Sequence, residues 1–122
     1  MITIHYCLRR KSGLSLTEFT EYWKGKHADL VSALADQLGI VSYVQNHAVI
    51  PEVAKEMSAM RGSAEPFDGV AAISFASAED LARSNVDPES AHAQLLLAED
   101  EAKFIDVANS VILFTAAHEV IA

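Results

Sequence analysis

The chain has 122 residues, of which 51% are hydrophobic and 21% are charged, and its formal net charge at pH 7 is −8. This length suits one domain with a modest core, so residues 1–122 are expected to form a single domain. The negative charge disfavours nucleic-acid binding, which depends on Lys and Arg at phosphates, and no stretch approaches the ~20 apolar residues of a membrane-spanning helix.

The first predicted element is a strand at Ile2–Leu8, because its residues are largely apolar or β-branched and "RRKSG" follows it. The initial residues place their charges after the apolar run and offer no cleavage site of small residues, so they do not resemble a secretory signal. We therefore expect a cytoplasmic protein. Cys7, the only cysteine, is expected to be a small buried hydrophobe in this strand rather than a nucleophile.

A helix is predicted from Leu16 to the turn at Gly39, because Ser15 and Glu18 have the spacing of a capping box. One face of this helix recurs at intervals of three and four and covers an arc of roughly 80° at ~100° per residue. This face contains Leu16, Phe19, Trp23, His27, Leu30 and Leu34. His27 is therefore expected to point towards the sheet.

Residues 40–49 are predicted to form a second strand, in which Tyr43, Gln45 and His47 share one face at every second position. The sequence leaves two interpretations of this polar stripe equally open. The stripe is either a solvated sheet edge or the wall of a pocket, and in the second case it converges on His27.

A connecting stretch at residues 50–68 follows, with a short helix expected around "EVAKEMSAM" and a turn at "FDG". The third strand is predicted at Val70–Ala76. The chain therefore has two strands in succession between its two helical regions.

The second helical region is predicted to start at Ser77, where Asp80 has the capping-box spacing. Asp87 followed by proline is typical of the N-cap of a new helix, and the helical region is expected to continue to about Phe104. The last strand is predicted at Ser110–Val120.

The resulting β-α-β-β-α-β order is that of ferredoxin-like folds, so we expect an α+β domain with a four-stranded antiparallel sheet and helices on one face. The first, third and fourth strands are apolar at nearly every position. In a sheet with one solvent-exposed face, apolar and polar residues would alternate along each strand. No further helix is available to cover the second face. We therefore expect a homodimer, in which the same face of a second copy covers it.

His27 is the main candidate for chemistry, although a lone histidine on an apolar face is more often a hydrogen-bonded core residue. With an ordinary pKa of ~6.5, a partly buried His27 can be neutral at neutral pH and act as a general base. Tyr43 would then donate a hydrogen bond to the enolate oxygen formed when a proton is removed next to a carbonyl. His47 or Gln45 would serve as a second donor.

Other candidate contacts surround His27. Trp23 lies one turn before it and would touch any ligand there, although a core role is commoner. His5 in the first strand is expected to reach either the pocket or the dimer interface. Nothing resembles a nucleophile with its base, a phosphate loop or a cofactor-binding glycine turn, and no ligand spacing supports a metal site at His27 and His47. We therefore expect no cofactor.

Several segments resemble the EthD family of dimeric α+β barrel proteins. They are "LRRKSGLSLTEFTEYWKGKHADLV", "YVQNHAV", "AEPFDGVAAISFAS" and "LLAEDEAKFID", in family order over most of the chain. The resemblance implies a ferredoxin-like subunit, dimerisation through the sheets and a pocket between the sheet and the helices of each subunit.

Related members include muconolactone methylisomerases and dehydratases or decarboxylases of aromatic polyketides. In the methylisomerase pattern, the helix histidine and the tyrosine of the second strand act on the lactone, and these match His27 and Tyr43. The match of His47 is looser, and "IPEVAKEMSAMRGS" is longer than in the methylisomerase. The lactone specificity is therefore not transferred, and this stretch is a candidate lid over a different substrate.

Two kinds of function are expected. The first is a cofactor-independent enzyme that enolises, dehydrates or isomerises a small cyclic or aromatic carbonyl compound, with His27, Tyr43 and His47 as catalytic residues. Its expected substrate contacts are Trp23, Gln45, Asn46 and His5. The second is a non-catalytic ligand-binding or accessory protein of a catabolic monooxygenase system, as the naming of the family suggests. A third and weaker hypothesis is a cofactorless or haem-dependent monooxygenase, because similar barrels host such chemistry.

Overall fold

Four strands form one antiparallel sheet in a computed structural model that describes all residues, 1–122. The strands are β1 (Ile2–Leu8), β2 (Ile40–His47), β3 (Gly69–Phe75) and β4 (Val111–Thr115), and their order in the sheet is β2-β3-β1-β4. All three neighbouring pairs are antiparallel. This arrangement confirms the predicted α+β, ferredoxin-like fold.

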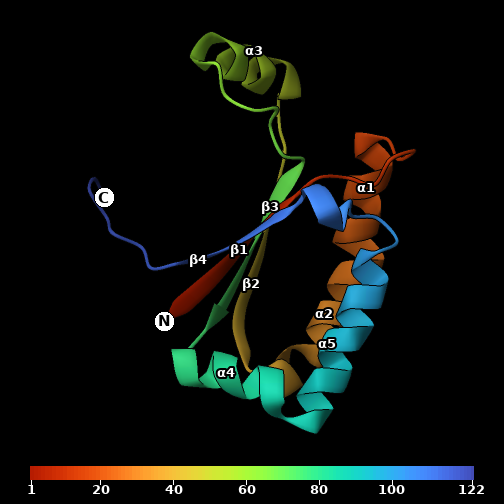
Figure 1. Cartoon of the computed structure of the whole chain (residues 1–122), viewed down its shortest axis with the longest axis vertical. Coiled ribbons are helices and arrows are strands. Elements are labelled where there is room, and N and C mark those ends of the chain that lie inside the picture. Colours follow the sequence, from red (N-terminus) through yellow and green to blue (C-terminus); the bar gives the residue numbers. More distant parts are fainter.

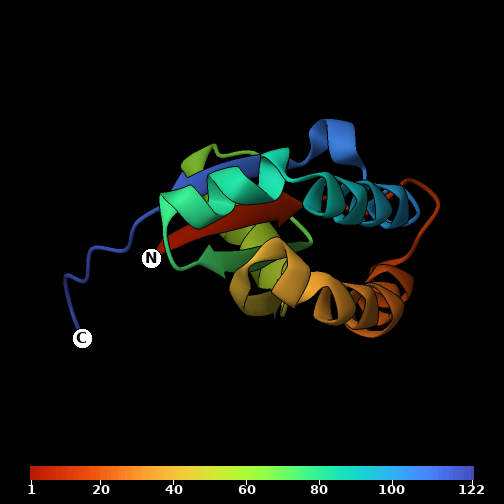
Figure 2. The same ribbon diagram turned by 90° about the horizontal axis from the view of Figure 1, so that it is seen from below.

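Helices cover one face of the sheet. A continuous helical segment joins β1 to β2, α3 lies between β2 and β3, and two further helices and a short 3-10 turn precede β4. Their bounds are α1 (Leu16–Tyr22), η1 (Trp23–His27), α2 (Ala28–Leu38), α3 (Pro51–Arg61), α4 (Ala78–Val86), α5 (Pro88–Glu101) and η2 (Val107–Asn109). Figure 1 shows α1, α2 and α5 on one side of the sheet, and Figure 2 shows α2 and α5 side by side. None of these helices is long and apolar enough to cross a bilayer.

The predicted helix starts are confirmed by their caps. The Ser15 hydroxyl accepts a hydrogen bond from the Glu18 N–H, and the Glu18 carboxylate accepts one from the Ser15 N–H, which completes the capping box. The side chains of Ser77 and Asp87 likewise accept hydrogen bonds at the starts of α4 and α5. Gly39 ends α2 in the left-handed conformation, at φ 73°.

The first helix differs from the prediction at η1, where the backbone makes a π-helical turn. A π turn holds one extra residue, which rotates all following side chains by about 100° relative to a continuous α-helix. Leu30 and Leu34, which the α-helical pattern placed on the buried face, are therefore only partly buried. The fully buried residues of this segment are Phe19, Trp23, His27, Val31 and Leu38.

The last strand is shorter than expected, so the prediction of a strand over Ser110–Val120 was wrong. β4 pairs only with β1, and its last pair joins Thr3 to Thr115. Because β1 begins at Ile2, the residues beyond Thr115 have no strand to pair with. They leave the sheet as exposed chain (Figure 1).

The predicted short helix in the connecting stretch is present as α3. It stands away from the sheet and from the other helices (Figure 1), and none of its residues is buried. The apolar side chains of its N-cap residue Ile50 and of Val53, Met57 and Met60 are all exposed. The helix is therefore a projecting arm and contributes nothing to the core.

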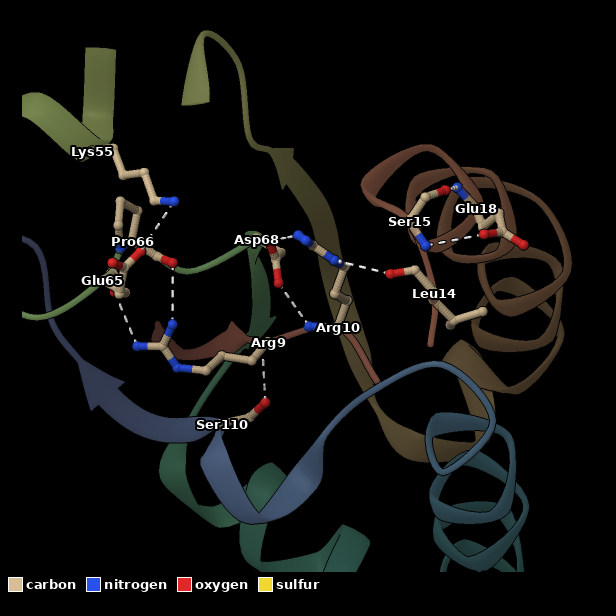
Figure 3. Close-up of polar contacts among 10 residues, drawn as sticks. All are labelled: Arg9, Arg10, Leu14, Ser15, Glu18, Lys55, Glu65, Pro66, Asp68 and Ser110. Atoms are coloured by element: carbon tan, nitrogen blue, oxygen red, sulfur yellow. Dashed lines mark hydrogen bonds and ion pairs between the residues drawn. The ribbon is translucent and has the colours of Figure 1, made fainter. Parts of the chain in front are cut away.

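Two arginines fasten the base of this arm to the end of β1 (Figure 3). The Arg9 guanidinium donates hydrogen bonds to the carbonyl oxygens of Glu65 and Pro66, at 3.0 and 3.1 Å. The Arg10 guanidinium pairs with the Asp68 carboxylate at 2.7 Å, and the Arg10 N–H donates to the same carboxylate at 2.7 Å. Both cations therefore have partners within the chain.

The core consists of two buried clusters. The first lies around η1 and contains Leu8, Phe19, Trp23, Ala71, Phe104 and Ile105. The second lies between α2 and α5 and contains Val31, Leu38, Ala93 and Leu97. A Cβ atom on Gly69 would lie 2.5 Å from Cζ3 of Trp23, so glycine at this position lets β3 approach the indole ring.

Candidate active site

A cavity of about 260 Å³ lies between the sheet and the helices and touches both core clusters. Ligand pockets for drug-sized molecules have volumes of roughly 300–1,000 Å³, so this cavity suits a smaller ligand. Most of its lining is apolar. The exceptions are His27, Asn85, Gln94 and Glu101, and two tyrosines, Tyr6 and Tyr43, are also among the lining residues.

The Asp100 side chain on α5 holds His27 in place. Nδ1 of His27 lies 2.8 Å from Oδ2 of Asp100, and the two residues are only 5% and 8% exposed. Because a carboxylate accepts hydrogen bonds and cannot donate them, Nδ1 carries the proton. Nε2 of His27 has no hydrogen-bond partner within the chain, so its lone pair is free, and His27 is one of the residues that line the cavity.

Two further groups bind the Asp100 carboxylate. The Tyr22 hydroxyl donates to Oδ1 at 2.6 Å, and the Lys103 ammonium lies 3.4 Å from the same oxygen. Burial acts to raise the pKa of Asp100, but Tyr22, His27 and Lys103 outweigh it and hold this pKa below its usual value. The same contact raises the pKa of Tyr22 to about 12. Asp100 is therefore an ionised carboxylate at neutral pH.

His27 itself is neutral at neutral pH. Burial lowers its pKa below the usual value, and the hydrogen bond and charge of Asp100 oppose this effect without reversing it. A neutral imidazole with a fixed tautomer beside a carboxylate is the arrangement that a general base requires. The geometry therefore adds to the predicted base a partner that orients it.

Tyr43 on β2 lines the same cavity. Its hydroxyl oxygen accepts hydrogen bonds from Nε1 of Trp23 and from Nε2 of Gln45, both at 3.1 Å. Both lone pairs are then occupied, so the hydroxyl hydrogen is free to donate. Burial raises the pKa of Tyr43, although Gln45 and Trp23 act to lower it, so the hydroxyl stays protonated.

The rest of the polar stripe also faces the helices. Nε2 of Gln45 donates to the Trp23 carbonyl oxygen at 2.8 Å, which orients the amide so that Oε1 faces Nε2 of His47 at 2.9 Å. The His47 ring packs against Trp23 with 4.5 Å between ring centroids, and His47 does not line the cavity. Burial and the charge of Lys24 lower the pKa of His47. Gln45 thus contacts the Tyr43 hydroxyl directly, and His47 contacts Gln45.

Two predicted substrate contacts lie on the other face of the sheet. Asn46 points away from the helices and donates to the Val70 carbonyl oxygen at 3.2 Å. Nδ1 of His5 lies 3.1 Å from the Thr115 hydroxyl on the same outer face. Neither residue lines the cavity, whereas Trp23 does.

Glu101 is a cavity residue that the sequence pattern did not single out. Its carboxyl group makes no hydrogen bond or ion pair within the chain, and burial followed by the charge of Asp100 raises its pKa to about 7. Burial raises the pKa of Tyr6 as well, and the Glu101 charge adds to this effect. Glu101 therefore faces the tyrosines of the sheet across the cavity.

A helical period could have identified Asp100 as a residue of the buried face of α5. Ala93, Leu97, Asp100 and Phe104 follow one another at intervals of four, three and four, which is the spacing of a buried face. An acidic side chain on such a face needs a partner or a raised pKa. No group of three or more His, Cys, Asp or Glu side chains comes together in a way that could hold a metal ion.

Comparison with known protein families agrees with the resemblance seen in the sequence. The sequence profile of the EthD domain matches residues 11–108. No curated protein matches the chain in sequence.

Several solved structures share the fold. An EthD family protein from Bacillus halodurans C-125 is 15% identical, with 97% of this chain and 100% of that chain covered and a TM-score of 0.62. A dimeric protein of unknown function from Bacteroides fragilis is 10% identical, with 93% of each chain covered and a TM-score of 0.58. A dimeric ferredoxin-like protein of unknown function from Jannaschia is 12% identical, with 96% of this chain and 100% of that chain covered and a TM-score of 0.56.

Proposed function

Because the chain belongs to the EthD family, we propose that it is a cofactor-independent enzyme that removes a proton next to the carbonyl group of a small cyclic or aromatic compound. One observation carries this proposal. Nε2 of His27 and the hydroxyl hydrogen of Tyr43 both lack a partner within the chain, and both residues line one apolar cavity. A base and a hydrogen-bond donor for the same small ligand are thus available together.

The chemistry follows from these two groups. Nε2 of His27 takes the proton from the carbon next to the carbonyl, and Asp100 stabilises the imidazolium that forms. The electron pair moves to the carbonyl oxygen, which accepts a hydrogen bond from Tyr43. Most of the cavity lining is apolar, and fixed donors act more strongly on a developing oxyanion in surroundings of low dielectric constant.

Wild-type protein is expected to exchange the α-protons of propiophenone for deuterium in D₂O faster than buffer does. The rate should rise with pH as His27 loses its proton and should level off below the ordinary histidine pKa of ~6.5, because burial lowers the pKa of His27. Proton NMR measures the exchange. A His92→Gln variant controls for unspecific catalysis by an exposed histidine and should behave like wild type.

A wild-type rate no higher than that of buffer, for propiophenone and for cyclic analogues such as tetralone, would contradict the proposal. Native mass spectrometry of the purified protein would then be informative. An intact small molecule that stays bound and unconverted would favour a ligand-binding accessory protein over an enzyme.

We also propose that the chain forms a homodimer through the outer face of the sheet. Val44, Ala72, His5 and Leu113 form one row across this face, and Val44 and Leu113 are 49% and 56% exposed. No helix covers this face (Figure 1). Two proteins of similar fold are dimeric, which supports a second copy as the cover.

A Leu113→Glu variant is expected to be a monomer at micromolar concentration, because a twofold axis brings two copies of the new charge close together. Sedimentation velocity measures the change from the dimer expected for wild type. Leu95→Glu, at an equally exposed leucine on α5, should leave the dimer intact. A dimeric Leu113→Glu variant would place the interface elsewhere.

A further inference from the structure

We propose that Glu101 is a second catalytic residue, the general acid that protonates a departing hydroxyl group when the substrate loses water. This inference rests on the proposed function, since it needs the enolate that His27 and Tyr43 produce. It also deepens that function, because it selects dehydration of a β-hydroxy carbonyl compound from among the reactions that begin with an enolate.

The position of Glu101 supports an acid. Glu101 lines the same cavity as His27 and Tyr43, and its carboxyl group has no hydrogen-bond or ion-pair partner within the chain. It extends from α5, whereas Tyr6 and Tyr43 extend from the strands on the opposite wall. A molecule bound between the walls would therefore lie within reach of groups on both sides.

The charges around Glu101 favour its protonated form. The titratable groups that face it are Asp100 beside it on α5, His27 on η1, Tyr6 on β1 and Tyr43 on β2. Asp100 is ionised, the other three are neutral, and no Lys or Arg side chain lines the cavity. Nothing therefore compensates a second negative charge, and the pKa of Glu101 is raised to about 7.

A neutral base and a protonated acid in one cavity complete an elimination. Nε2 of His27 takes the α-proton, and the C–H electron pair forms the enolate that Tyr43 stabilises. The enolate then collapses to the α,β-double bond, the bond from the β-carbon to oxygen breaks, and the Glu101 proton joins the departing oxygen to give water. The imidazolium of His27 returns one proton through solvent to the Glu101 carboxylate, so the cycle closes without an oxidant or a metal.

The same charges define the substrate class. An ionised Asp100 lies close to the cavity, and no cation lines it, so a carboxylate substrate would meet only repulsion. We therefore infer a neutral substrate, such as a β-hydroxy ketone or lactone with an apolar ring.

The test uses β-hydroxypropiophenone, which carries both exchangeable α-protons and a β-hydroxyl group. NMR in D₂O follows α-exchange, and ultraviolet absorbance follows formation of the enone. Wild type is expected to catalyse both reactions, and its elimination rate should fall as the pH rises above about 7, where Glu101 loses its proton. Glu101→Gln should lower elimination by roughly 100-fold, the low end of a general-acid contribution, and should lower α-exchange by far less.

Two variants complete the design. Glu99→Gln makes the same change at an exposed position of α5 and should behave like wild type. Glu101→Asp retains a carboxyl group and should recover part of the elimination rate. Elimination by Glu101→Gln within a few-fold of wild type would overturn the proposal, and so would loss of α-exchange together with elimination. Wild type that exchanges α-protons without eliminating water would also overturn it, whereas wild type without exchange would contradict the proposed function instead.

Discussion

Replacing His27 by glutamine is expected to lower the catalysed α-exchange rate by on the order of 10³-fold, because the amide cannot take a proton and general-base catalysis contributes about 10²–10⁴-fold. Asp100→Asn is expected to cost nearly as much. An asparagine amide that donates to Nδ1 would move the ring proton to Nε2, where the base needs its lone pair. Steady-state exchange rates for both variants, measured by NMR with propiophenone, check these effects.

The double variant should be no slower than the slower of the two single variants. His27 and Asp100 act as one unit, so their effects on catalysis are not additive. Lys103→Gln is the matched control, since the Lys103 ammonium contacts the same carboxylate from a largely exposed position. It should alter the rate by no more than a few-fold. An Asp100→Asn variant with the wild-type rate would show that the 2.8 Å contact does not prepare His27 for catalysis.

Local signals predicted most of the fold. Ser15, Ser77 and Asp87 were recognisable as caps because an N-cap depends only on residues a few positions away. The period of two on β2 grouped Tyr43 with Gln45 and His47, and the structure shows that this group faces the helices. The sequence alone left that orientation open, because an edge strand can turn either face to solvent.

Long-range contacts and a local change in helix phase account for the features that were missed. Asp100 meets His27 across 73 positions of sequence, and no local spacing reveals such a pair. The π turn shifts the phase of the helix by one residue. A pattern fitted to 3.6 residues per turn therefore predicts Leu30 and Leu34 on the buried face, whereas the structure buries Val31 and Leu38. The end of β4 depends on where β1 begins, which lies more than a hundred residues earlier.

Glu101→Gln is expected to stabilise the protein above neutral pH. The pKa of Glu101 is raised by burial and Asp100 from 4.5 to about 7, so between these values the folded chain binds a proton that the unfolded chain has released. Its contribution to the free energy of unfolding therefore falls as pH rises from 4.5 to about 7 and is constant above that. At about 1.4 kcal/mol for each pKa unit, the variant should gain up to about 3 kcal/mol over wild type near pH 8.

Urea unfolding of both proteins at several pH values and one fixed protein concentration measures this difference, because the stability of a dimer depends on concentration. Near pH 4.5 the two free energies of unfolding should coincide, and Glu99→Gln should follow wild type throughout. A gain in stability together with the loss of elimination would mark Glu101 as a group that the fold retains for chemistry at a cost in stability. A difference that does not change with pH would mean that Glu101 titrates normally in the folded protein, and the neutral acid in the cavity would have no basis.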